Sequence, residues 1–186
     1  MKKKYHNLLI IGKDSSDFTT ILTKNLYKNG SFVFYDKEGK YYKENEKRLT
    51  NLGYQVSAIN LANGYHDSML SSFISPTNML SKKMAVFFII PRSKPQEEIE
   101  EIYKGIFKRV KMEKNYLKKL YPTSVPIKFF MPDSLIQSTF SSIKRIKDNR
   151  YTSFIITAKG KNDKLDLNFF DNVIYLKKKK GILKWI

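Results

Sequence analysis

The feature that most constrains the fold of this sequence is a series of short apolar runs separated by longer stretches with helical spacing. Each run has the length of one strand, and several are apolar at consecutive positions, as in strands buried on both faces. The runs cover residues 8–11, 31–35, 55–61, 84–90, 127–131, 152–157 and 172–176. Strands that alternate with helices predict an α/β fold, here a three-layer, mostly parallel sheet of about seven strands.

Four stretches between the runs predict helices, and one of them, residues 41–52, is mostly polar. We expect helices over residues 18–30, 41–52, 95–120 and 135–147, and we expect turns or loops over residues 36–40 and 62–83. The longest helix begins with glutamates and continues with lysines, the polarity that a helix dipole favours. Those glutamates therefore need no catalytic explanation.

Length and cysteine content narrow the classes of protein that this chain can belong to. A chain of 186 residues suits one domain, and we expect residues 1–186 to share one core. The chain has no cysteine and two histidines, His6 and His66, so disulfides, thiolate zinc sites and cysteine nucleophiles are excluded. No apolar run approaches the roughly 18 to 20 residues that span a bilayer, so we expect no membrane span.

The chain is strongly basic, with 35 Lys and Arg against 17 Asp and Glu and a formal net charge of +18. Most of the excess is lysine, which suits attraction to phosphates or anionic lipids better than the reading of base edges. A solvated lysine surface explains the same charge. The candidate nucleic-acid or anionic surface consists of Lys104, Lys108, Lys111, Lys118, Lys119, Lys177, Lys178, Lys179 and Lys180.

The loop after the first expected strand is where an α/β sheet would bind phosphate. It reads GKDSSDFT from Gly12 to Thr19, and it aligns at both ends with the P-loop pattern G-x-x-x-x-G-K-[ST]. Asp17 stands at the second glycine and Phe18 at the lysine. Two acids, Asp14 and Asp17, would repel a triphosphate. The match alone is therefore weak.

The order of elements along the chain resembles the nucleotide-binding core of type IV secretion coupling proteins, the TraG-like conjugative DNA-transfer ATPases. The resemblance covers roughly residues 6 to 177. In that family a P-loop strand is followed by a strand that runs into an Asp-Pro-Lys-Gly-Glu-Leu-Tyr segment, a helix and a Gly-Tyr-x-Val strand. The matching stretches here are NLLIIG, SFVFYDKEGKYYKENEKRLTNLGYQVSAINL, MAVFFIIPRSKPQEEIEEIYKGIFKRV, PIKFFMPDSLI, IKDNRYTSFIITAKGK and FDNVIYL. The resemblance implies a P-loop NTPase domain of RecA-like topology.

The departures from the family pattern fall on the residues that would do chemistry. The Walker B strand of the family ends in Asp-Glu, where this chain has Pro132 and Asp133, and Thr157 replaces an expected glutamine. We expect the family's all-α insertion, between about Ser68 and Lys83, to be reduced to a loop, and we expect none of the family's membrane helices. The residues at vestigial nucleotide-binding positions are Gly12, Asp17, Phe18, Thr19, Asp36, Asp133 and Arg150.

Without the P-loop lysine and the Walker B acid, phosphoryl transfer loses charge neutralisation and metal placement. The resemblance therefore implies an inactive ATPase-like domain with no catalytic residues, no metal site and no cofactor, and we do not expect residual ATP or magnesium binding. It would bind a protein partner, such as a coupling ATPase, in conjugative or type IV DNA-transfer machinery of a mobile element. We expect a cytoplasmic protein, which could lie peripherally at the inner face of the membrane and form a homo-oligomer.

Two other functions stay open from the sequence. The charge is compatible with a basic module that binds nucleic acid without sequence preference. A diverged nucleotide-binding ATPase or other enzyme would have to use the remaining polar residues. Asp36 and Asp133, at the ends of two expected strands, could hold a cation, although turn roles explain both. His66, Asp67 and Ser68 are adjacent in sequence. Because catalytic triads are assembled from separate segments of the chain, this adjacency does not indicate a triad.

Overall fold

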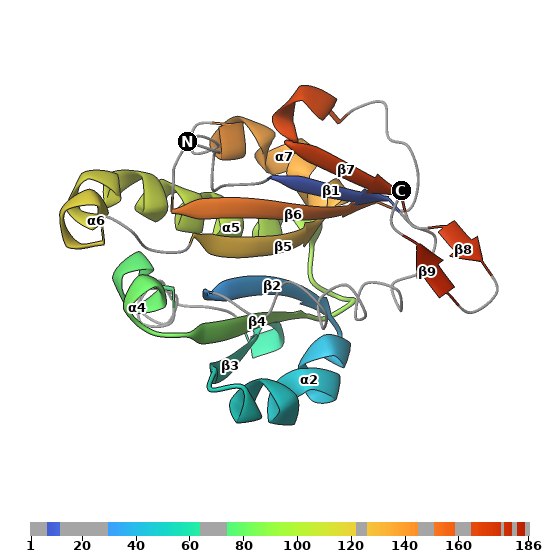
Figure 1. The fold of residues 1–186 in the computed structure, drawn as a ribbon, viewed down its shortest axis with the longest axis horizontal. Coiled ribbons are helices and arrows are strands. Elements are labelled where there is room, and N and C mark those ends of the chain that lie inside the picture. Colours follow the sequence, from blue (N-terminus) through green and yellow to red (C-terminus); the bar gives the residue numbers. More distant parts are fainter. Residues whose placement is uncertain are drawn as a thin grey trace.

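The computed structural model describes residues 7–11, 30–63, 74–121, 126–144, 151–158, 165–175, 177–179 and 182–184. Its main sheet has the strand order β3-β4-β2-β5-β6-β1-β7 (Figure 1). All six pairings between neighbouring strands are parallel. The strands are β1 (Leu8–Ile11), β2 (Phe32–Lys37), β3 (Gln55–Asn60), β4 (Met84–Ile90), β5 (Ile127–Pro132), β6 (Thr152–Ala158) and β7 (Asn172–Tyr175). The predicted α/β class and parallel sheet are confirmed.

Helices connect the strands, and a short hairpin follows the sheet. The helices are α2 (Lys40–Asn51), α4 (Pro76–Ser81), α5 (Gln96–Met112), α6 (Lys114–Leu120) and α7 (Asp133–Lys144), with 3-10 turns η2 (Leu61–Asn63) and η3 (Leu167–Phe169). Strands β8 (Lys177–Lys179) and β9 (Ile182–Lys184) pair antiparallel. Within the described ranges, no helix is both long enough and apolar enough to span a membrane.

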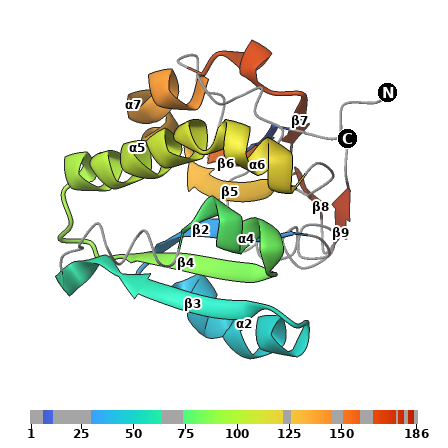
Figure 2. The same cartoon turned by 90° about the vertical axis from the view of Figure 1, so that its left-hand side faces the viewer.

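The helices cover both faces of the sheet. After β2 the chain moves toward the β3 edge through α2, whereas after β3, β4 and β5 it moves the other way through α4, α5 with α6, and α7. Because parallel crossovers are right-handed, the two directions put helices on opposite faces. Figure 2 shows α4, α5 and α6 in front of the sheet and α2 behind β3.

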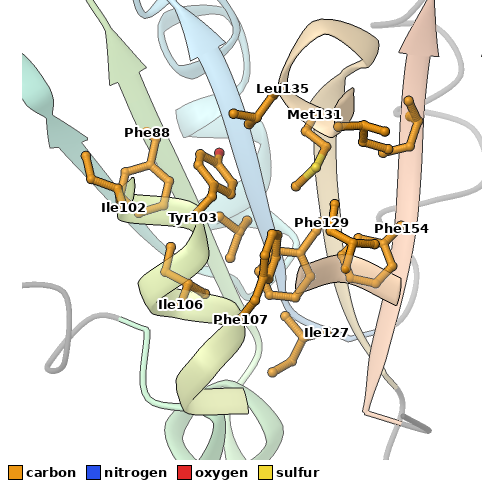
Figure 3. Packing of buried hydrophobic residues seen from close by; sticks show 14 of the residues in the cluster. Phe88, Ile102, Tyr103, Ile106, Phe107, Ile127, Phe129, Met131, Leu135 and Phe154 are labelled. Carbon is orange, nitrogen blue, oxygen red and sulfur yellow. The ribbon is translucent and has the colours of Figure 1, made fainter. Parts of the chain in front are cut away.

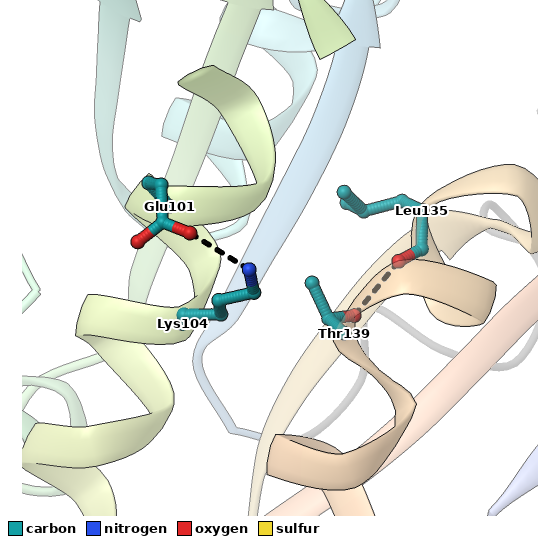
Figure 4. A network of polar contacts seen from close by, with 4 residues as sticks. All are labelled: Glu101, Lys104, Leu135 and Thr139. Atoms are coloured by element: carbon teal, nitrogen blue, oxygen red, sulfur yellow. Dashed lines mark hydrogen bonds and ion pairs between the residues drawn. The ribbon is translucent and has the colours of Figure 1, made fainter. Parts of the chain in front are cut away.

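The larger core lies between the sheet and helices α4, α5 and α7. At its centre Phe107 of α5 contacts Phe129 and Phe154, with ring centroids 5.4 and 5.6 Å apart (Figure 3). The buried face of α5 supplies this contact, and its residues are Ile99, Ile102, Tyr103, Ile106, Phe107 and Val110. Thr139 of α7 is also buried here, and its hydroxyl donates to the Leu135 carbonyl at 2.8 Å (Figure 4).

The smaller core lies on the opposite face, against α2. Leu49 of α2 packs on a group of aromatic side chains from the middle of the sheet, namely Phe32, Phe34, Phe87 and Phe130. Phe32 makes edge-to-face contacts with Phe87 and Phe130, each with centroids 5.8 Å apart. The alternation of strand side chains between the two cores explains why these strands are apolar at consecutive positions.

The structure corrects three element boundaries expected from the sequence. Strand β2 continues through Lys37, so Asp36 lies in the strand and not in the following turn. The single helix expected over residues 95–120 is divided at Glu113 into α5 and α6. Glu113 keeps a hydrogen bond to the Arg109 carbonyl at 3.0 Å, so the backbone bends without losing its helical bonding.

The third correction is α4, which lies within the stretch predicted to be a loop and within the region of the expected helical insertion. Pro76 is at its first position, which suits a helix start. Its end is held by Ser31, whose hydroxyl lies 2.6 and 2.7 Å from the carbonyl oxygens of Met79 and Lys82. Ser31 also accepts a hydrogen bond from the Met84 amide at 2.8 Å. A helix this short depends on such distant contacts.

Candidate functional site

The carboxyl end of β2 is the point of the described sheet where a ligand site is expected. Strand β2 leads into α2 on one face, whereas its neighbours β4 and β5 lead into α5 and α7 on the other face. In open α/β sheets, ligands bind at such switch points, beyond the carboxyl ends of the strands. We refer to residues 35–39, 90–96 and 132–134 as the β2 edge.

The strand register places the predicted acids at this edge. Phe34 of β2 is opposite Phe130 of β5, so Asp36 and Pro132, each two residues further along, lie at the same level of the sheet. Asp36 is opposite Ile89 of β4 on the other side. Asp133 follows Pro132 directly as the first residue of α7. The pairing of β2 with β5 therefore brings Asp36 and Asp133 to the ends of neighbouring strands, an adjacency that the sequence did not specify.

Asp36 is a helix cap in this structure. Its side chain is 0% exposed, and its two carboxylate oxygens accept hydrogen bonds from the amides of Tyr41 at 3.1 Å and Tyr42 at 2.7 Å. Burial raises the pKa of the Asp36 carboxyl above its ordinary value, while these amide bonds act in the opposite direction. A carboxylate at the first turn of α2 satisfies amides that the helix leaves without partners.

Asp133 belongs to the start of α7. Its Oδ1 accepts a hydrogen bond from the Ser134 amide at 3.0 Å, and an acid in the first helical turn is favoured by the helix dipole. The two predicted acids therefore serve two different helices. Among the described residues, no group of three or more His, Asp or Glu side chains has the arrangement of a metal site.

The turn between β2 and α2 has an unusual backbone. Glu38 has a φ of 62° and Gly39 a φ of 70°, and the first is rarely adopted by a residue with a side chain. A Cβ atom on Gly39 would also lie 3.2 Å from Ile89. The Glu38 amide donates to the Ile90 carbonyl at 3.0 Å, which links this turn to the end of β4. Residues in such conformations cluster at functional sites.

Charged side chains surround the turn. The Glu38 carboxylate forms an ion pair with Arg92, whose Nη2 lies 3.2 Å from Oε2. Lys94 pairs with Glu98 one helical turn later. Gln96 at the start of α5 donates to the Ser134 carbonyl at 3.5 Å, so this contact joins α5 to α7. The β2 edge thus presents an ordered set of paired charges.

Two tyrosines lie beneath this edge on the α5 face. Tyr103 is fully buried, and its hydroxyl has no hydrogen-bond partner within the described part of the chain. Burial and the nearby Tyr35 hydroxyl raise the pKa of Tyr103 well above its ordinary value. Figure 3 shows the Tyr103 hydroxyl directed toward Leu135. Its phenol is therefore a neutral hydroxyl at physiological pH.

Several predicted site residues lie outside the described residues. These are Gly12, Asp17, Phe18, Thr19, His66, Asp67, Ser68, Arg150 and Lys180. The expected helix over residues 18–30 likewise falls almost wholly outside them. Thr157 is opposite Pro132 in the β5–β6 pairing, so these two departures from the family pattern are neighbours.

The predicted basic surface divides between two parts of the structure. Lys104, Lys108 and Lys111 are on α5, and Lys118 and Lys119 on α6, whereas Lys177, Lys178 and Lys179 form β8. Lys104 donates to the Glu101 carboxylate at 2.7 Å (Figure 4), which raises the pKa of Lys104 above its ordinary value. Lys108, Lys111, Lys118 and Lys119 are exposed.

Sequence reasoning missed Glu38, Arg92 and Tyr103 as residues of the site. Arg92 could have been found from its position, because it lies two residues after Ile90, the last residue of the apolar run that forms β4. Nothing in the sequence marked Tyr103 as a site residue, because its spacing along α5 is that of a core residue. Searches against protein-family models, curated proteins and solved structures returned no match.

Proposed function

We propose that this chain is a non-catalytic, TraG-like domain that binds a protein partner in conjugative or type IV DNA-transfer machinery. The observation that carries the proposal is the use of Asp36, which the resemblance places in the nucleotide-binding segment. Its carboxylate is buried and bonded to the amides of Tyr41 and Tyr42. An acid held in this way serves the fold, and it is not presented to a metal ion or a phosphate.

The strand order supports the RecA-like part of the proposal. In RecA-like topology the P-loop strand and the Walker B strand are separated by one strand. Strand β6 lies between β1, which leads into the P-loop-like sequence, and β5, which corresponds to the Walker B strand. The end of β5 carries Pro132, which offers no ligand to magnesium.

The departures from the family's sequence pattern also support a non-catalytic domain. Phosphoryl transfer depends on positioning and on neutralising the charge of the phosphates. Phe18 in place of the P-loop lysine and Pro132 in place of the Walker B acid remove both contributions. A scaffold without this chemistry retains its surfaces, and binding to another protein is the role that such a scaffold can still perform.

The partner prediction is tested by affinity purification of the tagged full chain from its native cells after mild crosslinking. We expect enrichment of a coupling ATPase or another DNA-transfer component over an untagged control. Recovery of no component of such machinery would contradict the proposal.

The catalytic prediction is tested separately by phosphate release from Mg·ATP in a malachite-green assay. We expect release no faster than in buffer alone. Magnesium-dependent turnover that Asp133→Ala abolishes would show a diverged ATPase and would overturn the non-catalytic assignment.

A further inference from the structure

Helices α5 and α6 carry one row of side chains that changes from basic to apolar. Residues four apart lie along the same ridge of a helix. Lys104, Lys108, Met112, Tyr116 and Leu120 follow this spacing across the bend at Glu113. Hydrogen bonds from Glu113 to Arg109 and from Leu117 to Glu113, at 3.0 and 2.9 Å, continue the helical pattern through the bend. The row is therefore continuous.

The apolar half of this row is exposed. Met112, Tyr116 and Leu120 are 74%, 56% and 47% exposed. Among the described residues they are three of the six large hydrophobic side chains recorded as exposed, and they fall within nine consecutive positions. The opposite side of the same helices is buried through Val110 and Leu117, so the exposed row is not needed to fasten them to the sheet.

Lysines flank the exposed apolar row. From Lys108 to Tyr121 the sequence contains six basic residues and one acidic residue, Glu113. Lys108, Lys111, Lys114, Lys118 and Lys119 are exposed, whereas Glu113 is partly buried. We call Lys108, Lys111, Met112, Lys114, Tyr116, Lys118, Lys119 and Leu120 the α6 tip.

The α6 tip projects from the body of the protein. A helix rises about 1.5 Å per residue and a strand about 3.3 Å per residue. By this measure α5 alone is as long as the strands that it covers. Helix α6 therefore extends past the sheet, and Figure 1 shows it at the left-hand margin of the molecule, beyond the amino end of β6. The β2 edge is at the opposite ends of the strands, so both surfaces can be occupied at once.

We propose that the α6 tip docks onto the surface of an anionic lipid bilayer. The exposed lysines match the negative charge of the headgroups, and Met112, Tyr116 and Leu120 match the boundary between headgroups and acyl chains. A projecting helix can reach a flat surface without rearrangement of the sheet. The phosphates of nucleic acid would use the same lysines, but phosphate contacts leave the exposed Met112 and Leu120 without a role.

The test is sedimentation of the full chain with phosphatidylcholine vesicles that contain about 30% phosphatidylserine. We expect binding to these vesicles and little binding to pure phosphatidylcholine. The variant K111Q/K114Q/K118Q should bind at least tenfold more weakly, because each lysine near an anionic surface contributes a factor of about five. The variant M112S/Y116S/L120S keeps the charge and should still lose about fivefold or more.

Matched controls come from other exposed parts of the chain. K43Q/K47Q/K82Q removes the same charge from α2 and the end of α4, and L52S removes a side chain as exposed as Leu120, at 47%. Both should bind as the wild type does, and thermal melting should show that every variant is folded. Wild-type binding by M112S/Y116S/L120S, or no binding to phosphatidylserine vesicles, would overturn the proposal. Binding to a DNA duplex alone would reassign the α6 tip to nucleic acid.

Discussion

Lys128 is a cation placed on the sheet itself. It lies on β5, opposite Phe32 of β2, and its neighbours Ile127 and Phe129 point into the larger core. Strand alternation therefore directs Lys128 to the other face, the face of α2. Burial lowers the pKa of Lys128 to about 8. Keeping this ammonium charged costs folding free energy.

The pKa of Lys128 predicts a pH dependence of stability. Between pH 8 and about 10.5 the unfolded chain binds the Lys128 proton and the folded chain does not, so the penalty disappears as the pH rises through this window. Lys128→Met should be more stable than the wild type at pH 7, on the order of 1 to 2 kcal/mol because part of the side chain reaches solvent. Urea unfolding should show this difference shrinking toward pH 10.5.

Lys118→Met, at an exposed position of α6, is the matched control and should show no such trend. A Lys128→Met variant that is less stable than the wild type at pH 7 would mean that the ammonium makes a favourable contact which outweighs its burial.

The backbone conformation of Glu38 predicts a second effect on stability. Its φ of 62° disfavours any residue with a Cβ atom, and glycine removes that cost. Glu38→Gly should therefore stabilise the protein by about 0.5 to 1 kcal/mol, since an exposed ion pair with Arg92 contributes little. Glu38→Ala, which removes the ion pair but keeps the Cβ, should be neutral or slightly destabilising. Thermal unfolding of the three proteins measures both effects, and a loss of stability in Glu38→Gly would show that the Arg92 contact dominates.

At the scale of elements, the connection between β2 and α2 shows how one buried acid organises a helix start. Asp36 supplies both of its oxygens to α2. The substitution Asp36→Asn leaves only one side-chain oxygen to accept a hydrogen bond. The new side-chain NH2 group faces a backbone N–H and cannot accept a hydrogen bond from it. We expect a loss of about 1 to 3 kcal/mol in unfolding free energy and faster hydrogen exchange at Tyr41 and Tyr42. Unchanged exchange at these amides would contradict the capping role and reopen a ligand role for Asp36.

The sequence predicted the elements that are stabilised by their own residues, and it missed those that are stabilised by distant contacts. The β4 run is continuously apolar and the buried face of α5 is periodic, so the residues of each element indicate its structure. Helix α4 is held by Ser31, more than forty positions away, and no local pattern contains that contact. The extension of β2 to Lys37 follows from its pairing with β4, which is also a distant interaction.

At the scale of the whole molecule, the strand order decides where chemistry can occur. Parallel strands are joined by crossovers, so the neighbours of β2 are elements far along the chain, β4 and β5. This arrangement places the Glu38 turn beside Arg92 and beneath the starts of α5 and α7. It also separates the β2 edge from the α6 tip by the length of the strands. The β2 edge would therefore stay accessible while the α6 tip is docked onto a bilayer.

The sequence by itself determined the α/β class, most of the strands and the course of the long amphipathic helix, because hydrophobic periodicity is a local property. It also placed Asp36 and Asp133 at the ends of strands. Only the tertiary structure decided the strand order, the capping role of Asp36, the pairing of Glu38 with Arg92 and the exposure of the α6 tip. Each of these depends on contacts between distant segments, and burial and charge pairing exist only once those segments are packed together.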